Sequence, residues 1–99
     1  MIRLPDPLRF KWDDGNKDKN WLKHQVSTTE AEEAFFDANK KLATDIIHSF
    51  EHEKRYILLG KTRLERLLLI VFTIRDNNIR VISARDLNRK EAPLYEEKN

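Results

Sequence analysis

The sequence contains no cysteine, and this absence excludes several kinds of chemistry at once. Disulfide bonds, thiolate catalysis and zinc sites with cysteine ligands all require that residue. The chain also has only two glycines, at positions 15 and 60, so it lacks a glycine-rich loop that binds nucleotide phosphates. We therefore expect no cofactor and a scaffold that depends on its hydrophobic core.

Long apolar runs are absent as well. No segment approaches the length that crosses a membrane, and the N-terminus lacks the apolar stretch of a signal peptide. We therefore expect a cytoplasmic protein with no membrane partner. The 99 residues are long enough for one modest core, so we expect one domain over residues 1–99. Pro5 and Pro7 disfavour a helix, which makes residues 1–7 a loose lead-in.

Charge is abundant but unevenly distributed. Charged residues make up 36% of the chain, whereas the formal net charge is only +2. Residues 54–66 are strongly basic, and residues 28–37 carry carboxylates without a basic side chain. We expect one surface that attracts phosphate and another that repels it. Lys61 and Arg63, in the basic segment, are candidate contacts for an anionic partner.

The most informative stretch is residues 67–85, in which two apolar runs are joined by Asp76-Asn77-Asn78. Both runs are rich in β-branched and aromatic residues and have the length of strands. Asp and Asn tolerate a positive φ, so the stretch predicts a β-hairpin with a tight turn. Its first strand, residues 67–74, is apolar on both faces and is therefore expected to be a covered central strand.

Arginines of this hairpin are candidate binding residues. With a two-residue loop, strict alternation places Arg75, Arg80 and Ala84 on one face and Ser83 and Arg85 on the other. Arg75 and Arg80 then lie close together near the turn. Like charges across a hairpin cost stability, so this pair either binds an anionic partner or points into solvent. The same alternation prevents Arg80 and Arg85 from lining one flat site.

The remaining sequence predicts an α+β fold with a small, mostly antiparallel meander, two N-terminal helices and a C-terminal helix. A strand is expected at residues 8–12, and a helix from Asp13 to about position 24, anchored by Trp21 and Leu22. A second helix begins with the capping box of residues 27–30 and extends its apolar face to Phe36.

Strands are expected at residues 42–47 and 55–62. Gly60 indicates a bulge or a close approach. The last helix, residues 86–97, begins at Asp86 and kinks or restarts at Pro93.

Three histidines, at positions 24, 48 and 52, are the candidate imidazoles. His48 and His52 are four residues apart, which would suit a metal on a helix, but this span lacks helical patterning. We interpret both as loop side chains and expect no metal site. His24 has two open interpretations. Its ring either transfers a proton near neutral pH or lies on the surface at a helix C-terminus, where the dipole favours it.

The chain resembles the BrnT family of bacterial toxins along nearly its whole length. The family's Phe-x-Trp-Asp opening is matched by residues 10–13, and its Asn and Lys-His-Gly-Val segment by Asn20 and residues 23–26. Its Ser-x-x-Glu-Ala helix is matched by residues 27–31 and its Glu-x-Arg-Tyr strand by residues 53–56. Its hairpin is matched by residues 71–75 and 79–85, and its closing pattern by residues 89–96. Gln25, where the family has Gly, and Pro93 depart from the family's pattern.

The resemblance implies a RelE-like, microbial-ribonuclease-like fold and a toxin of a type II toxin–antitoxin system. Such toxins are endoribonucleases that cleave RNA without a metal and arrest translation and growth. The implied partners are RNA and a BrnA-like antitoxin, whose ribbon-helix-helix domain binds operator DNA, in a hetero-oligomer. The alternative is a non-catalytic binding module that only complexes such a repressor or nucleic acid.

RNA cleavage without a metal needs a base for the 2′-hydroxyl, an acid for the leaving 5′-oxygen and cations beside the phosphate. His24 is the candidate base or acid, and Arg80 and Arg85 are the candidates that stabilise the phosphate. For Arg85, an ion pair with Glu91 or Glu96 is the open alternative. The further candidates are Lys23, Arg55 and Tyr95 for catalysis, and Arg75, Lys61 and Arg63 for RNA binding.

Overall fold

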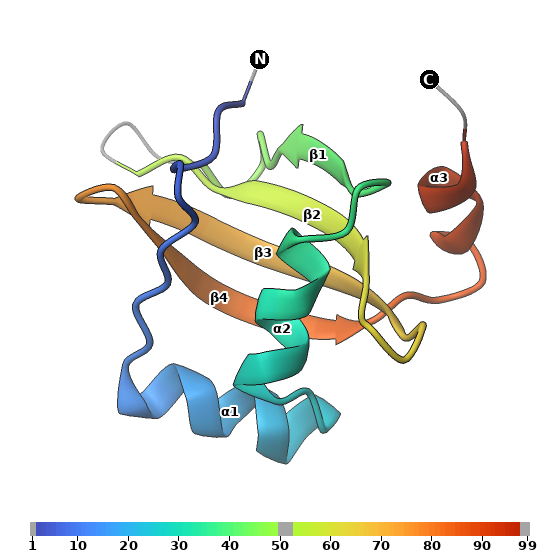
Figure 1. Cartoon of the computed structure of the whole chain (residues 1–99), viewed down its shortest axis with the longest axis horizontal. Helices are drawn as coiled ribbons and strands as arrows, with labels where there is room; N and C mark the ends of the chain where they lie inside the picture. Colours follow the sequence, from blue (N-terminus) through green and yellow to red (C-terminus); the bar gives the residue numbers. More distant parts are fainter. Residues whose placement is uncertain (1, 50–52, 98–99) are drawn as a thin grey trace.

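The computed structural model describes residues 2–49 and 53–97. Within these residues, three helices and a four-stranded antiparallel sheet form an α+β fold (Figure 1). The helices are α1 (Asp14–His24), α2 (Thr28–Phe35) and α3 (Ala92–Glu96). The strands are β1 (Lys41–Thr44), β2 (Tyr56–Lys61), β3 (Leu67–Arg75) and β4 (Asn78–Asp86), in the spatial order β1-β2-β3-β4. The predicted meander with two N-terminal helices and a C-terminal helix is confirmed.

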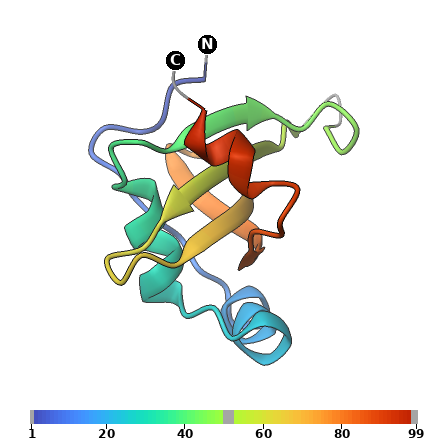
Figure 2. The ribbon, with the colours of Figure 1, turned by 90° about the vertical axis from the view of Figure 1, so that its right-hand side faces the viewer.

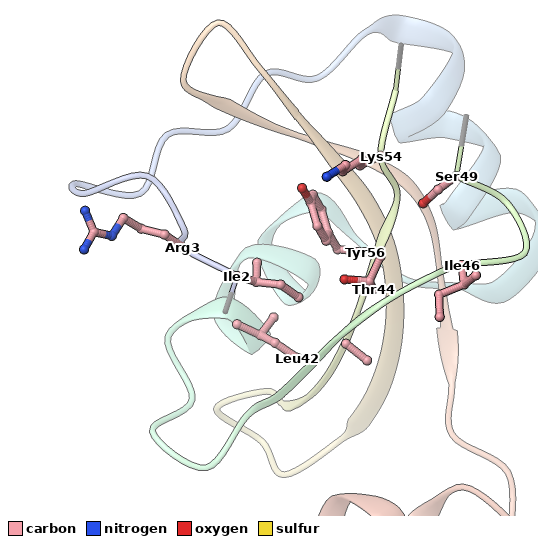
Figure 3. Close-up of a pocket in the computed structure, with 9 residues that line it drawn as sticks. Ile2, Arg3, Leu42, Thr44, Ile46, Ser49, Lys54 and Tyr56 are labelled. Carbon is pink, nitrogen blue, oxygen red and sulfur yellow. The ribbon is translucent and has the colours of Figure 1, made fainter. Parts of the chain in front are cut away.

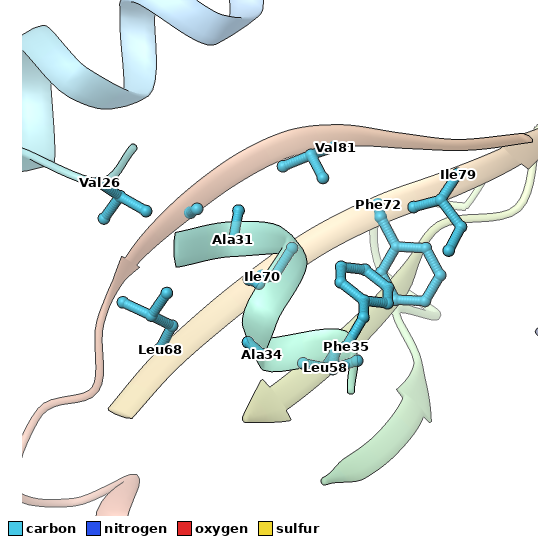
Figure 4. Close-up of a cluster of buried hydrophobic side chains, with 11 residues drawn as sticks. Val26, Ala31, Ala34, Phe35, Leu58, Leu68, Ile70, Phe72, Ile79 and Val81 are labelled. Atoms are coloured by element: carbon cyan, nitrogen blue, oxygen red, sulfur yellow. The ribbon is translucent and has the colours of Figure 1, made fainter. Parts of the chain in front are cut away.

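A hydrophobic core fills the space between α2 and one face of the sheet (Figure 4). Side chains alternate along β3, so Leu68, Ile70 and Phe72 point into this core. The predicted capping box fixes the start of α2, because Ser27 Oγ accepts from the Glu30 N–H and the Glu30 carboxylate accepts from the Ser27 N–H. The core cluster consists of Val26, Ala31, Ala34, Phe35, Leu58, Leu68, Ile70, Phe72, Ile79, Val81 and Ala84.

The opposite face of the sheet is only partly covered. Figure 2 shows α2 on one side of the sheet and α3 on the other, and Leu94 of α3 lines a pocket with Leu59 and Leu69. Helix α1 lies along the outer edge of β4, where the Ala84 N–H donates to Asn20 Oδ1. We call the sheet face opposite α2 the open face. It carries Ile57, Leu59, Leu69, Val71, Thr73, Arg75, Arg80, Ser83 and Arg85.

A β-bulge in β4 overturns the strict alternation expected for the hairpin. Phe72 pairs with Val81, but the preceding residue, Val71, pairs with Ser83, so Ile82 is an extra residue on β4. An extra residue reverses the alternation beyond it. Ala84 therefore points into the core with Val81, whereas Arg85 joins Arg80 on the open face. Our expectation that Arg80 and Arg85 lie on opposite faces was wrong.

The hairpin has the two-residue loop on which the expected alternation was based, Asp76-Asn77, since β3 ends at Arg75 and β4 begins at Asn78. Asp76 and Asn77 have φ values of 53° and 61°, which is the pattern of a type I′ turn. This turn suits the right-handed twist of the flanking strands.

The N-terminal segment is less regular than expected. Residues 8–12 form one isolated parallel bridge, Phe10 with Ile79, rather than a strand. The Lys11 N–H donates to the Ile79 carbonyl, and the Ile79 N–H donates to the Arg9 carbonyl. The alternating side chains still pack on the core, so the segment covers the edge of β4 near the turn.

The structure also differs from several of the expected element boundaries and buried anchor residues. Trp21 and Leu22 are 54% and 77% exposed, so they do not anchor α1; buried Asn20 does. Phe36 is exposed just beyond α2 rather than part of its apolar face. The strand expected at residues 42–47 is β1, which ends at Thr44 and is followed by a turn.

The C-terminal helix is shorter than expected. Asp86 ends β4 and does not cap a helix, and α3 starts only at Ala92, with Pro93 in its first turn. Proline is tolerated there because the N–H groups of a first turn have no partner within the helix. Of the two alternatives expected at Pro93, a kink or a restart, the structure therefore has a helix start.

Candidate active site

The open face carries a row of arginines. Arg75 pairs with Asn78 next to the turn, Arg80 pairs with Thr73, and Arg85 pairs with Leu69 at the far end of the same hairpin. The bulge brings this row together, because without it Arg85 would point towards α2. An arginine row on a partly exposed sheet face is suited to bind phosphate groups in succession.

Each of these arginines already has a carboxylate nearby. Arg75 Nη2 lies 3.0 Å from Glu53 Oε1, and Arg80 Nη2 lies 3.9 Å from Asp13 Oδ2. Arg55, in the segment before β2, lies 3.8 Å from the same Glu53. The pairs are partly exposed, so each is weakly stabilising and can be exchanged for another anion. Glu53 thus holds Arg55 and Arg75 together at the turn end of the face.

The ion pair of Arg85 is closer than the others. Its Nη1 and Nη2 donate to both oxygens of Glu91, at 2.8 and 2.7 Å. The hydrogen bonds from Arg85 lower the pKa of Glu91, which also accepts from the Asn88 N–H. The geometry is bidentate, which is also the geometry of arginine on a phosphate. The ion pair that we left open for Arg85 is therefore formed, with Glu91.

The C-terminal turn of α1 carries Lys23 and His24. His24 is four residues after buried Asn20, so both lie on the helix face that meets β4. The charge of His24 contributes to lowering the pKa of Asp86, after the larger effect of hydrogen bonds from Arg66. His24 is thus close to the end of β4 that carries Arg85, whereas Lys23 is exposed.

Arg66 is a central residue that the sequence analysis missed. Its guanidinium donates to both oxygens of Asp86, at 2.6 and 3.1 Å, and to Glu30 Oε2 at 3.0 Å. It also donates to the carbonyls of His24 and Gln25, at 3.0 and 2.8 Å. Hydrogen bonds with Asp86 raise the pKa of Arg66, so it stays charged. Arg66 therefore holds the His24 turn against α2 and the end of β4.

Tyr95 and Lys61 come together, away from the arginine row. The Tyr95 hydroxyl donates to Asp37 Oδ2 at 2.5 Å, and the Lys61 N–H donates to the same oxygen at 2.9 Å. The Lys61 ammonium lies 5.8 Å from the centre of the Tyr95 ring. Burial and the contact with Asp37 raise the pKa of Tyr95 to about 12. The geometry makes Tyr95 the anchor of α3.

The acidic and basic segments do not form two separate surfaces as expected. Glu30 is paired with Arg66, and Glu33 Oε1 accepts from the Arg63 N–H at 3.1 Å. Asp37 accepts from Lys61 as described. The acidic helix α2 thus lies against the basic segment, and its carboxylates lie next to Lys61 and Arg63. Lys61 ends β2 with its side chain on the sheet face that α3 covers, and Arg63 lies in the turn after β2, so neither belongs to the arginine row.

The second histidine candidate has a local partner. His48 Nδ1 lies 2.9 Å from Asp45 Oδ2, in the turn after β1. His52 lies outside the described residues. Among the residues that the structure describes, no group of three or more histidine, aspartate or glutamate side chains is arranged to hold a metal ion. No helix in this part of the chain is both long and apolar enough to cross a membrane.

A solved structure supports the fold. The crystal structure of the Brucella abortus ribonuclease toxin BrnT aligns with a TM-score of 0.61 and 16% sequence identity. The alignment covers 83% of this chain and 99% of that chain. At this identity the match establishes the fold alone. Among curated proteins, none matches this sequence.

The sequence itself places the chain among the ribonuclease toxins of type II toxin–antitoxin systems. A family model described as "Ribonuclease toxin, BrnT, of type II toxin-antitoxin system" matches residues 12–91. The match includes α1, α2, the whole sheet and the Arg85–Glu91 pair. The chain belongs to the BrnT family.

Proposed function

We propose that this chain is a metal-independent endoribonuclease toxin whose RNA site is the open face of the sheet. The observation that carries this proposal is the bulge at Ile82, which aligns Arg75, Arg80 and Arg85 on one face. Membership of the BrnT family supports the ribonuclease class. Cleavage of RNA then inhibits translation and growth, and a BrnA-like antitoxin that binds operator DNA neutralises the toxin.

The proposed chemistry is transfer of the phosphoryl group to the neighbouring 2′-oxygen. A base removes the 2′-hydroxyl proton, the 2′-oxygen attacks phosphorus, and the 5′-oxygen leaves with a proton from an acid. The products are a 2′,3′-cyclic phosphate and a 5′-hydroxyl. His24 is the proposed base or acid, because imidazole exchanges protons near neutral pH. Arg80 and Arg85 stabilise the charge that builds up on the phosphate oxygens.

The other candidates have supporting roles in this proposal. Arg75 and Arg55 extend the cationic face towards the turn, with Glu53 between them. Lys23 is an exposed cation beside His24 that contacts the RNA backbone. Lys61 and Arg63 make outer contacts only. We leave Tyr95 out of the catalytic set, because its hydroxyl proton is donated to Asp37 and its raised pKa makes it a poor acid.

The test is cleavage of a bulk RNA by the purified chain in excess EDTA. We expect wild type to cleave, and His24→Ala, Arg80→Ala and Arg85→Ala to lose roughly 100-fold or more in rate. Arg3→Ala is the matched control, because it removes an exposed arginine on the other side of the sheet and should cleave like wild type. A cyclic phosphate end is the expected product.

The same assay separates the alternative. Soluble wild type that leaves RNA intact but still binds its antitoxin would support a non-catalytic binding module. Cleavage that stops in EDTA and returns with Mg²⁺ would contradict metal independence. Cleavage that survives all three substitutions would move the site away from the open face.

A further inference from the structure

A groove lies beside the outer edge of β1, on the side of the sheet that faces α2 (Figure 3). Its volume is about 770 Å³. Strand β1 is the first strand in the sheet order, so its outer edge faces the groove rather than another strand of the described sheet. The lining mixes apolar side chains with hydroxyl and two basic side chains, and consists of Ile2, Arg3, Leu42, Ala43, Thr44, Ile46, Ser49, Lys54 and Tyr56.

The backbone of β1 offers hydrogen bonds along this edge. The Asp45 N–H donates to the Arg55 carbonyl, which places Asp45 opposite Arg55 in a hydrogen-bonded pair. Such pairs alternate in an antiparallel ladder, so Ala43 also faces β2 with its N–H and carbonyl. The N–H and carbonyl groups of Leu42 and Thr44 therefore point outwards. An outer strand whose backbone groups point away from the sheet is a template for an added strand.

Two isoleucines in the turn after β1 point to a protein partner. Ile46 and Ile47 are 83% and 86% exposed, and Ile46 lines the groove. Adjacent exposed isoleucines at an open strand edge are unusual on a monomer and typical of an interaction site. A nucleic acid is less suited to this surface, because the lining offers four aliphatic side chains and only two cations, Arg3 and Lys54.

The charge of the surface selects among protein partners. Arg3 and Lys54 line the groove, and the described lining contains no carboxylate. Two copies of this chain joined at their β1 edges would place two such grooves, each with Arg3 and Lys54, side by side on one face of the joined sheet, which is unfavourable. A partner with Asp or Glu side chains avoids that repulsion and gains attraction. The surface therefore fits an acidic segment rather than a second copy.

We propose that the antitoxin docks here by adding an extended segment, in which apolar residues alternate with Asp or Glu, to the outer edge of β1. Its backbone pairs with Leu42 and Thr44, and its apolar side chains cover Ile46 and fill the groove. The proposal rests on the antitoxin that the proposed function requires. The site is on the opposite side of the sheet from the arginine row, so binding here and RNA cleavage are separable.

The test is titration calorimetry of the full chain with the purified antitoxin encoded beside it. We expect the Ile46→Asp/Ile47→Asp double variant to bind at least roughly 30-fold more weakly than wild type, because it places charge in the docking surface. Thr44→Pro, which removes an outward N–H, should weaken binding at least roughly tenfold while the sheet stays intact. Leu64→Asp is the matched control, since Leu64 is 94% exposed in the turn between β2 and β3.

A second measurement follows amide hydrogen exchange in the free chain and the complex. The amides of Leu42 and Thr44 should exchange at least roughly tenfold more slowly in the complex. Arg80→Ala should bind the antitoxin within about twofold of wild type, because Arg80 lies on the open face.

The outcomes separate this proposal from the proposed function. Equal binding by wild type and the folded double variant, or no binding by wild type, would overturn the docking site. A free chain that dimerises in sedimentation through Ile46 and Ile47 would overturn it in favour of a second copy. Loss of RNA binding instead of antitoxin binding would also overturn it. If wild type leaves RNA intact but the double variant binds the antitoxin more weakly, the proposed ribonuclease activity is rejected and the docking site is retained.

Discussion

At the scale of single residues, two positions restrict which side chain they can hold. One has no room for a Cβ, and the other has a left-handed backbone conformation. Gly60 of β2 lies under α2, and a Cβ there would stand 2.6 Å from the Ala34 carbonyl oxygen and 3.0 Å from the Ala34 Cβ. Gln25 ends α1 with a φ of 52°, in the left-handed region that favours glycine. Neither position contacts RNA in our proposal, so each is a clean test of stability.

We expect Gly60→Ala to destabilise the protein by roughly 2 kcal/mol, because α2 must move away from the sheet. Urea unfolding measures the change. Gly15→Ala, inside α1, is the matched control, since a Cβ at this position meets Asp13 Oδ1 at an ordinary contact distance of 3.6 Å. This control should be more stable than wild type by about 0.5–1 kcal/mol. Equal effects of the two substitutions would contradict the close approach of α2.

Gln25→Gly should raise the free energy of unfolding by about 1 kcal/mol, because glycine adopts the left-handed conformation without strain. The bond from Arg66 to the Gln25 carbonyl is retained, since it uses the backbone. Lys19→Gly, inside α1, is the control and should lose about 1 kcal/mol. A loss of stability for Gln25→Gly would show that its side chain matters more than its backbone.

At the scale of elements, α3 is short and is fastened to the sheet by a few polar contacts. Tyr95 bonds to Asp37, the Lys41 Nζ donates to the Glu97 carbonyl at 2.5 Å, and Glu91 holds Arg85. A five-residue helix is not stable by itself, so these contacts decide its position. Helix α3 thereby links the arginine row to the other end of the sheet.

Tyr95→Phe should lower stability by about 1 kcal/mol at pH 7, because it removes one hydrogen bond while Asp37 keeps its backbone donors. The pKa of Tyr95 is raised from 10.0 to about 12, so its stabilising contribution is complete below pH 10 and is lost as the pH rises through 12. Urea unfolding at pH 7 and 11 should show this loss in wild type and less of it in the variant. RNA cleavage at pH 7 should be unchanged.

Glu91→Gln should tighten RNA binding, because the carboxylate that competes with phosphate for Arg85 is replaced by a neutral amide. We expect KM for RNA to fall roughly threefold to tenfold, with a smaller change in kcat. Glu96→Gln is the control, because Glu96 is exposed and one turn further on. A higher KM for Glu91→Gln would mean that Glu91 orients Arg85 for RNA instead of competing with it.

At the scale of the whole molecule, opposite charges that are far apart in the sequence hold the elements together. The chain has 19 basic and 17 acidic side chains, and its folded pairs join α2 to the turn before β3, β4 to the segment before α3, and β3 to the segment before β2. The contribution of each exposed pair is small, but several of them lower carboxylate pKa values together.

Stability should therefore fall in acid. Hydrogen bonds from arginines lower the pKa of Asp86 and Glu91, and in Glu30 and Asp37 hydrogen bonds outweigh the opposing effect of burial. Because these folded-state values are depressed, the stabilisation is complete above the unfolded-state pKa near 4 and is lost as the pH falls below it. We expect a loss of roughly 2 kcal/mol between pH 5 and pH 2.5 in urea unfolding.

Arg66→Gln is the matched variant for this measurement. It removes the donor shared by Glu30 and Asp86, so their pKa values return towards ordinary values and the loss of stability in acid becomes smaller. A wild-type free energy of unfolding that is flat across this range would contradict the assignment of these pairs.

Features that depend on neighbouring residues could be predicted from the sequence. The capping box at Ser27 and Glu30, the hairpin and the close approach at Gly60 follow from local hydrogen bonds, alternation and the absence of a side chain. The hairpin pattern singled out Arg75 and Arg80 as candidate cations, and Arg85 was added with the family resemblance. Their family context came from ordered motifs that span the chain.

The tertiary structure alone decided how these parts combine. Strict alternation along residues 79–85 buries either Arg80 or Arg85, and this conflict was the signal of a bulge in the sequence. The bulge resolves the conflict, because it lets Val81 and Ala84 both pack in the core while both arginines stay on the open face. Arg66 was missed because its partners lie 20 to 42 residues away. The sequence by itself therefore determined most of the elements and supplied the candidate residues, because both depend on local chemistry. Only the folded chain decided which face each residue shares, because that depends on contacts between distant segments.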